Sequence, residues 1–144
     1  MIPSPGNAKC DETARFPAGI EMLLDTNILI YAAAHEYPDL DALLSSGKFA
    51  ASVITRIEAL GFTRLEEVEK TALDALFARL RLLPLSDAVA EQAIDLRQRH
   101  KIRLADAIIA ATALVYGLPL VTRNVADYKR ITALNIINPF APTV

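Results

Sequence analysis

Short apolar segments with strand character alternate with helical segments along the chain from Met22 onwards. This alternation, without internal repeats or low-complexity tracts, is typical of a parallel sheet with helices packed on both faces. We therefore predict an α/β fold, with three layers (α/β/α) around a central, mostly parallel sheet. The predicted strands are Met22–Leu24, Lys48–Ala51, Leu82–Leu85, Leu118–Thr122 and Asn135–Ile137.

The segments between these strands carry helix start and stop signals. Ser52 and Ser86 are good N-caps, Thr63 and Glu66 have the spacing of a capping box, and Gly117 is a typical residue just past a helix end. Three of the predicted helices are Ile28–Ala34, Pro38–Ser46 and Leu104–Tyr116. A further helix follows Ser52 and carries Val53, Ile54, Ile57 and Leu60, and another follows Ser86 with Val89, Ala93 and Leu96 inward. The capping box opens an amphipathic helix with Leu65, Val68, Ala72, Leu73, Leu76, Phe77 and Leu80.

Composition narrows the class of protein. At 144 residues the chain is long enough for one domain with a real core, and 53% hydrophobic residues predict an aliphatic interior. A net charge of −2 provides no global basic field, so any binding of nucleic acid needs a local patch. One cysteine, Cys10, excludes an internal disulfide framework and favours a reducing, cytoplasmic compartment. The apolar runs are too short or too interrupted by charge to span a membrane.

Residues 1–21 differ from the rest of the chain. They contain several proline and glycine residues and lack the continuous apolar run of a signal peptide. We interpret them as an extension or leader, with Met22 as a natural start and residues 22–144 as the domain. The alternative, that they form an integral part of the fold, stays open.

Two acids stand where an α/β fold forms a site. Asp25 falls at the turn from the first predicted strand into a helix, and ligand crevices lie outside the carboxyl ends of parallel strands. Asp106 is the only charged residue from Leu104 to Thr122, and a lone carboxylate in a buried helix is costly unless it is paired, hydrogen-bonded or metal-bound. The alternatives are an N-cap for Asp25 and a first-turn acid favoured by the helix dipole for Asp106.

Three further polar residues belong to the same hypothesis. Glu58 lies among apolar neighbours in the helix after Ser52, Asn124 follows the strand Leu118–Thr122, and Asp127 comes one helical turn later. The alternatives are a solvated helix face and a polar loop with an Asn cap. If the acids converge, they repel one another and their pKa values rise, whereas a divalent cation removes the repulsion. Oxygen-only ligands suit Mg²⁺ or Mn²⁺, and the two isolated histidines offer no zinc cluster.

These residues carry a resemblance to a PIN domain, and more narrowly to the VapC-type toxins of VapBC toxin–antitoxin pairs. The resemblance covers Met22–Phe140 in order. It implies a PIN-like fold, hydrolysis of RNA phosphodiester bonds by an Mg²⁺- or Mn²⁺-dependent endoribonuclease, a homodimer, and a cognate antitoxin that blocks the site. The motifs are Leu-Leu-Asp25-Thr-Asn27-Ile-Leu-Ile, Ser52-x-x-Thr55-x-x-Glu58, Leu104-Ala-Asp106-Ala-Ile-Ile-Ala-Ala, Leu-Val-Thr122-Arg-Asn124-x-x-Asp127-Tyr and Ile136-Ile-Asn-Pro139-Phe.

The resemblance also assigns roles residue by residue. Asp25, Glu58 and Asp106 match the three usual metal-binding acids of the family. Thr26 and Asn27 match the polar residues beside the first acid, and Thr122 matches the polar residue after the fourth strand. For the fourth acid, many members have Asp where this chain has Asn124, while Asp127 matches a position that is often acidic. Since Asn124 carries no charge, the number of metal ions, one or two, stays open.

Local basic residues are candidates for RNA contact. Arg97, Arg99, Lys101 and Arg103 form a basic run that leads into the helix of Asp106, and Arg123 lies beside Thr122. The alternative is an ordinary solvated helix face. The amphipathic helices at Pro38–Ser46 and Leu65–Leu80 are candidate surfaces for a second copy and for an antitoxin segment, unless their apolar residues serve the internal core.

Other classes of α/β protein fit the motifs less well. A magnesium-dependent phosphatase with an Asp nucleophile usually has a second Asp two residues on, where this chain has Asn27. A receiver domain normally has paired acids early and a Lys after a late strand, which here ends Thr122-Arg123-Asn124. A PIN-like binding module with weakened catalysis remains a third alternative because Asn124 replaces an acid.

Overall fold

The computed structural model describes residues 19–140. Its five strands form one sheet in the order β3-β2-β1-β4-β5, and every neighbouring pair is parallel. The predicted α/β class with a parallel sheet is thereby confirmed. In chain order the elements are β1 (Glu21–Leu24), α1 (Thr26–Ala34), α2 (Pro38–Ser46), β2 (Lys48–Ser52), α3 (Val53–Leu60), α4 (Glu67–Phe77), β3 (Arg81–Leu83), α5 (Asp87–Arg99), α6 (Leu104–Tyr116), β4 (Leu120–Val121), α7 (Val125–Tyr128) and β5 (Ile136–Ile137).

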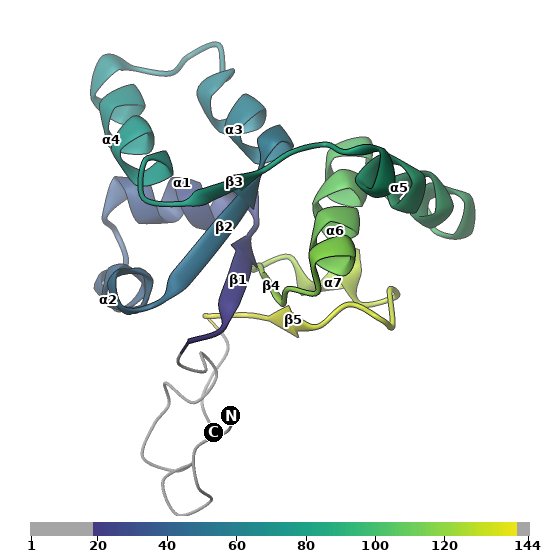
Figure 1. Cartoon of the computed structure of the whole chain (residues 1–144). Coiled ribbons are helices and arrows are strands. Elements are labelled where there is room, and N and C mark those ends of the chain that lie inside the picture. The colour runs from purple at the N-terminus through teal and green to yellow at the C-terminus, as the bar shows by residue number, and fades with distance from the viewer. Residues whose placement is uncertain (1–18, 141–144) are drawn as a thin grey trace, which may run out of the picture.

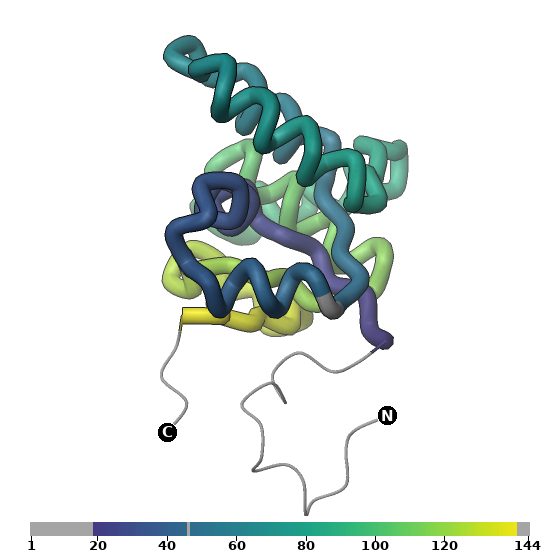
Figure 2. Tube along the Cα trace, turned by 90° about the vertical axis from the view of Figure 1, so that its left-hand side faces the viewer, coloured from purple at the N-terminus to yellow at the C-terminus, as the bar shows by residue number. Residues whose placement is uncertain are grey.

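Helices cover both faces of the sheet. In Figure 1, α1, α2 and α4 lie on one side of the strands, and α5, α6 and α7 lie on the other. Successive side chains of a strand point to opposite faces, so β1 serves two cores: Met22 and Leu24 pack with Ile28 and Leu29 of α1, whereas Leu23 packs with α5 and α6. Figure 2 views the molecule from the side that α1 and α2 cover.

The carboxyl ends of β1 and β4 meet at one edge of the sheet. Leu24 is paired with Val121, so the next residues of the two strands, Asp25 and Thr122, become neighbours. The Asp25 N–H donates to the Val121 carbonyl at 3.0 Å. This register brings together two polar residues that are far apart in the sequence.

The start of α4 differs from the prediction. The expected capping box joined Thr63 to Glu66, but the helix begins at Glu67, and the Glu66 N–H donates to the Glu69 carboxylate at 2.9 Å. Glu66 and Glu69 have the same spacing three residues later, and the capping box forms between them. Two apolar residues of the predicted helices, Ile57 and Val68, are 60% and 72% exposed.

Strand ends also shift by one or two residues. β3 begins at Arg81 and ends at Leu83, before Pro84, which has no N–H to donate to a ladder. β4 is confined to Leu120–Val121, and β5 to Ile136–Ile137. Most of the predicted leader and Cys10 lie outside the described residues. Across residues 19–140 every helix is too short or too polar to cross a membrane.

Candidate active site

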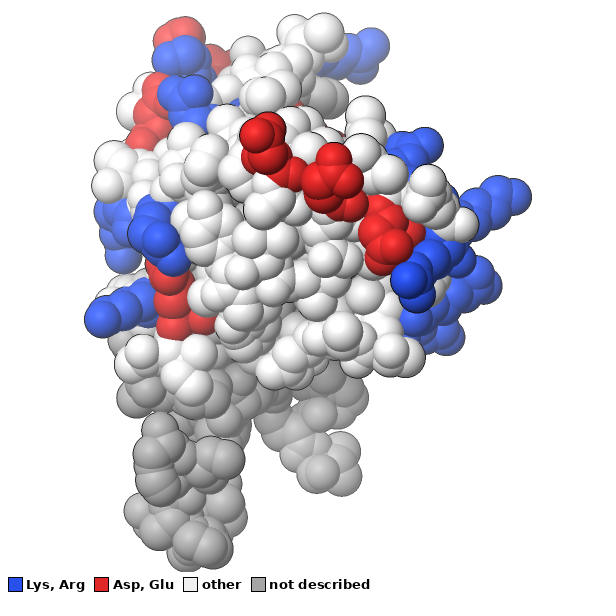
Figure 3. Space-filling model, turned by 45° about the vertical axis from the view of Figure 1, so that its right-hand side comes forward, with Lys and Arg blue, Asp and Glu red and all other residues white. Residues whose placement is uncertain are grey.

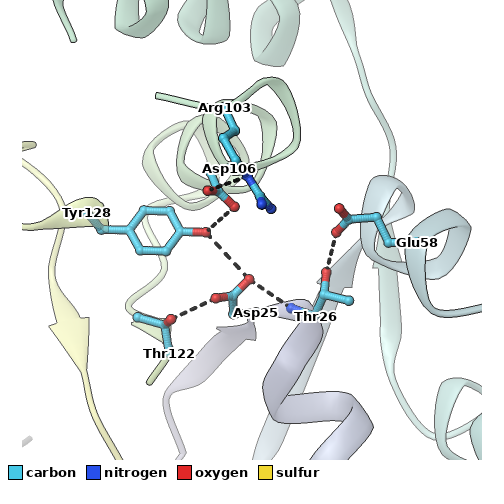
Figure 4. Close-up of polar contacts among 7 residues, drawn as sticks. All are labelled: Asp25, Thr26, Glu58, Arg103, Asp106, Thr122 and Tyr128. Atoms are coloured by element: carbon cyan, nitrogen blue, oxygen red, sulfur yellow. Dashed lines mark hydrogen bonds and ion pairs between the residues drawn. The ribbon is translucent and has the colours of Figure 1, made fainter. Parts of the chain in front are cut away.

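Asp25 stands at the end of β1, where its backbone is still extended and α1 begins. Its side chain is 5% exposed. Oδ1 accepts from the Thr26 N–H at 2.8 Å, and Oδ2 accepts from the Thr122 hydroxyl at 2.7 Å (Figure 4). Asp25 is therefore the N-cap of α1 and also a carboxylate fixed at the sheet edge.

Asp106 approaches Asp25 from the first turn of α6. The Tyr128 hydroxyl lies 3.2 Å from Asp106 Oδ1 and 3.4 Å from Asp25 Oδ1, so one buried phenol contacts both acids. Arg103 Nε lies 3.3 Å from Asp106 Oδ2, with the Arg103 side chain 77% exposed and that of Asp106 13% exposed. The structure thus brings these two predicted acids to one place.

Glu58 reaches the same region from α3 through a threonine. The Thr26 hydroxyl lies 2.7 Å from Glu58 Oε1 and 3.1 Å from the Thr55 hydroxyl. A carboxylate can only accept, so Thr26 donates to Glu58 and accepts from Thr55. Thr55 is fully buried. The chain Thr55, Thr26, Glu58 sets the position of the third acid.

Burial dominates the electrostatics of the two inner acids. Desolvation raises the pKa of Asp25, the bonds from Thr122 and Thr26 lower it, and the charges of Asp106 and Glu58 raise it by smaller amounts. Desolvation also raises the pKa of Asp106, the Arg103 charge and the Tyr128 hydrogen bond oppose this, and the charges of Asp127 and Glu58 add to it. Repulsion between converging acids therefore contributes, but it is secondary to their removal from water.

Three of the predicted polar residues lie further out. Asn27 is exposed in the first turn of α1. Asn124 is exposed before α7, and its N–H donates to the Thr122 hydroxyl at 3.0 Å. Asp127 is exposed on α7 and shares with Asp106 the wall of a cavity of about 270 Å³. Asp127 thus lies on the same surface as Asp106. Asn124 contacts Thr122 through its backbone N–H.

The basic residues divide between two places. Lys101, Arg103 and Arg130 line the same cavity as Asp106 and Asp127. Arg97 and Arg99 lie in the last turn of α5, where Arg99 pairs with Asp95 at 3.0 Å. Figure 3 shows one group of Lys and Arg side chains at its right-hand edge, at the end of a row of acidic side chains, and further Lys and Arg side chains at the left-hand and upper edges.

Arg123 is directed elsewhere. Its guanidinium lies 4.6 Å from the ring centroid of Phe140 and 5.6 Å from that of Tyr31. Hydrogen bonds to Tyr37 and Tyr31 raise the pKa of Arg123. The three rings pack edge to face with centroids 5.0–5.7 Å apart. Arg123 is therefore held in an aromatic cluster beside the site.

The oxygen donors around Asp25 and Asp106 suit a hard divalent cation, although the side chains alone do not surround an ion. Among residues 19–140, no three His, Cys, Asp or Glu side chains are close enough to hold one ion together. The donors are nevertheless all oxygen, and two of them are buried carboxyl groups with raised pKa values. Oxygen ligands with a remainder of water are typical of Mg²⁺ sites.

Two residues of this site were not predicted from the sequence. Tyr128 follows the predicted Asp127, but nothing in its spacing indicated that its hydroxyl would lie between two acids from other elements. Thr55 occurs inside the motif that ends at Glu58, and its distance of three residues from Glu58, about one helical turn, was the signal available.

The chain is similar in sequence and in fold to several known proteins. The model of the PIN domain family matches residues 22–134. Ribonuclease VapC10 of Mycobacterium tuberculosis is 32% identical over 128 residues, which is 83% of this chain and 93% of that protein. The crystal structure of VapBC2 from Rickettsia felis, bound to a DNA fragment from its promoter, aligns with a TM-score of 0.71 and 27% identity over 83% of this chain and 98% of that one. A toxin–antitoxin complex from Klebsiella pneumoniae aligns with a TM-score of 0.70 and 29% identity over 84% and 99% of the two chains.

Proposed function

The chain belongs to the PIN domain family, and from this premise we propose that it is a metal-dependent endoribonuclease, the toxin of a type II toxin–antitoxin pair. The observation that carries the proposal is the meeting of Asp25 and Asp106 on Tyr128, with Glu58 joined to them through Thr26. The names of the relatives support the activity and the toxin role.

Asp25 and Asp106 would hold Mg²⁺ or Mn²⁺ directly and Glu58 through a bound water, with Asp127 or Asn124 as an outer ligand. When bound, such a cation supplies charge neutralisation at the scissile phosphate and a water of lowered pKa. Thr122 and the Thr26 N–H orient the carboxylate of Asp25. In this proposal none of the side chains needs to act as a nucleophile toward the phosphate.

Phosphate charge on the RNA would be met by the cations around the cavity. Lys101, Arg103 and Arg130 line it beside Asp106, and Arg97 and Arg99 extend the basic surface along α5. Arg123 is held against Tyr31 and Phe140 beside the site, so it would contact only RNA that passes over these rings.

Substitution of the inner acids tests the activity. Asp25→Asn and Asp106→Asn should each abolish Mg²⁺-dependent cleavage of a mixed RNA substrate, with phosphate release from a phosphomonoester measured in parallel. Asp95→Asn, which removes a carboxylate from an exposed pair with Arg99, is the matched control and should cleave normally. Cleavage by both inner-acid variants at the wild-type rate would refute the proposal and leave a binding module.

An apolar groove next to Glu58 is the proposed seat of an antitoxin segment. The groove has a volume of about 260 Å³, and its walls come from α1, α3, α4 and their connections, including Ile30, Phe62 and Leu73. Glu58 is part of the wall, so a segment lying there would also cover the site. The described residues of α4 contribute to this groove, whereas α2 does not.

The partner can be tested with the small protein encoded by a neighbouring reading frame. Phe62→Asp should prevent its co-purification with this chain, because a charge would enter the apolar wall. Val68→Asp, at an exposed position of α4 outside the groove, is the control. Light scattering of the purified chain tests the proposed homodimer, for which α2 offers one candidate surface.

A further inference from the structure

Tyr128 is fully buried, yet its hydroxyl faces two acids rather than the apolar core around its ring. The hydroxyl oxygen lies 3.2 Å from Asp106 Oδ1 and 3.4 Å from Asp25 Oδ1 (Figure 4). We propose that Tyr128 is a positioning residue, whose hydroxyl holds these two carboxyl groups at the separation that a divalent cation needs. The inference rests on the proposed function, because it assumes that the two acids bind the cation.

Neither carboxylate needs this hydroxyl to satisfy its own hydrogen bonds. Asp25 already accepts from the Thr26 N–H and the Thr122 hydroxyl. Asp106 already pairs with Arg103. What the phenol adds is a link between the two acids, which come from the end of β1 and from α6. Among the described residues, no other hydrogen bond or ion pair joins the two acids through a single side chain.

A role in packing alone does not account for the hydroxyl. Phenylalanine would fill the same space against the core, and burying a hydroxyl costs free energy unless it finds a partner. A phenol has one proton, so it can donate to only one of the two carboxylates at a time. Sharing that proton between two ligand groups is an outer-shell arrangement of the kind whose loss typically weakens metal binding 10–100-fold.

Arg103 is the other residue that could orient Asp106, but its geometry makes it less able to set the separation. Its side chain is 77% exposed and touches only Asp106 Oδ2, on the outer side of the pair. Tyr128 is held rigidly by the core and contacts both acids. The difference predicts that removal of the Tyr128 hydroxyl changes cation affinity more than removal of the Arg103 charge.

The test is Mn²⁺ binding to the full chain, followed by the loss of the free-Mn²⁺ signal in electron paramagnetic resonance. Tyr128→Phe should weaken the affinity about tenfold or more. Tyr116→Phe is the matched control, because its ring packs under Arg81 at the far end of α6, and it should stay within about twofold of wild type. Arg103→Gln removes a positive charge that repels a cation and competes for Asp106 Oδ2, so it should not weaken the affinity.

RNA cleavage adds a signature that a merely structural role would not give. Cleavage by Tyr128→Phe should be weak at low Mn²⁺ and recover as Mn²⁺ is raised, whereas Asp25→Asn should not recover at any concentration. Equal Mn²⁺ affinity in wild type and Tyr128→Phe would overturn this inference and leave the proposed function intact. A wild-type chain that binds no Mn²⁺ would overturn both.

Discussion

The two buried acids make a sharp prediction about the stability of the metal-free protein. Asp25 Oδ1 and Asp106 Oδ1 both contact the Tyr128 hydroxyl, so they lie no farther apart than about 7 Å. At an effective dielectric constant of about 20, two unit charges at that separation repel by about 2 kcal/mol. Asp106→Asn removes this repulsion and the desolvation of one charge, and it loses the exposed Arg103 pair, which is worth about 0–1 kcal/mol. We therefore expect the variant to be about 2 kcal/mol more stable in EDTA at pH 8.

The sign of the pH dependence follows from the direction of the pKa shifts. The pKa values of Asp25 and Asp106 are raised above the ordinary value of 3.8. In the metal-free fold, the stability that these groups contribute is fully present below about pH 4 and is lost as pH rises through their raised pKa values. The advantage of Asp106→Asn over wild type should therefore grow from pH 4 towards pH 8.

Thermal unfolding in EDTA, followed by circular dichroism at several pH values, measures this difference. An advantage of about 2 kcal/mol corresponds to a rise in Tm of about 5–10 °C for a domain of this size. Saturating Mg²⁺ should reverse the order, because ligand at about 100 times Kd stabilises the wild type by about 2.7 kcal/mol. Asp95→Asn should show neither effect. An Asp106→Asn variant less stable than wild type in EDTA, or a difference independent of pH, would refute the reasoning.

Three further changes test other parts of the structure. Neutralising Arg97 and Arg99 should flatten the plot of log affinity for single-stranded RNA against log salt by about 1.4, since each lost phosphate contact reduces the slope by about 0.7; an unchanged slope would mean a solvated helix face. Gly117→Ala should lower the free energy of unfolding in urea by about 1 kcal/mol, because φ is +67° there although an added Cβ meets no described atom within 4 Å. Thr122→Val should lower it in EDTA by about 1–3 kcal/mol, since Oδ2 of buried Asp25 loses its donor; a neutral result would show that water replaces the hydroxyl.

The order of the elements could be predicted from the sequence because burial imposes a clear pattern on it. Leu104–Tyr116 is apolar on nearly every face, and α6 packs between the sheet and α5. Boundaries were less predictable where the chain offers equivalent choices. The acids after Thr63 allow a capping interaction in two registers, and the one that forms joins Glu66 to Glu69.

The candidate site was predictable in its residue types but not in its connections. Asp25 and Asp106 stand out as acids in apolar surroundings, and the sheet register then brings the first of them to Thr122. Tyr128 could not be found in this way, since its hydroxyl reaches the two acids only because its ring packs into the core with residues of α5 and α6. Asn124 is the opposite case, because the sequence predicted a site residue there. Its side chain is exposed, and its backbone N–H donates to the Thr122 hydroxyl.

The span of sequence between the partners of Asp25 has a consequence for the protein during synthesis. Thr122 and Tyr128 lie 97 and 103 residues after Asp25. Domains fold as units while the chain leaves the ribosome, and a nascent chain that ends with β4 has neither the donor to Oδ2 nor the phenol between the acids. In the proposed ribonuclease, the site is therefore complete only once nearly the whole domain has been released, so a half-made copy would not cleave the RNA of the translating ribosome.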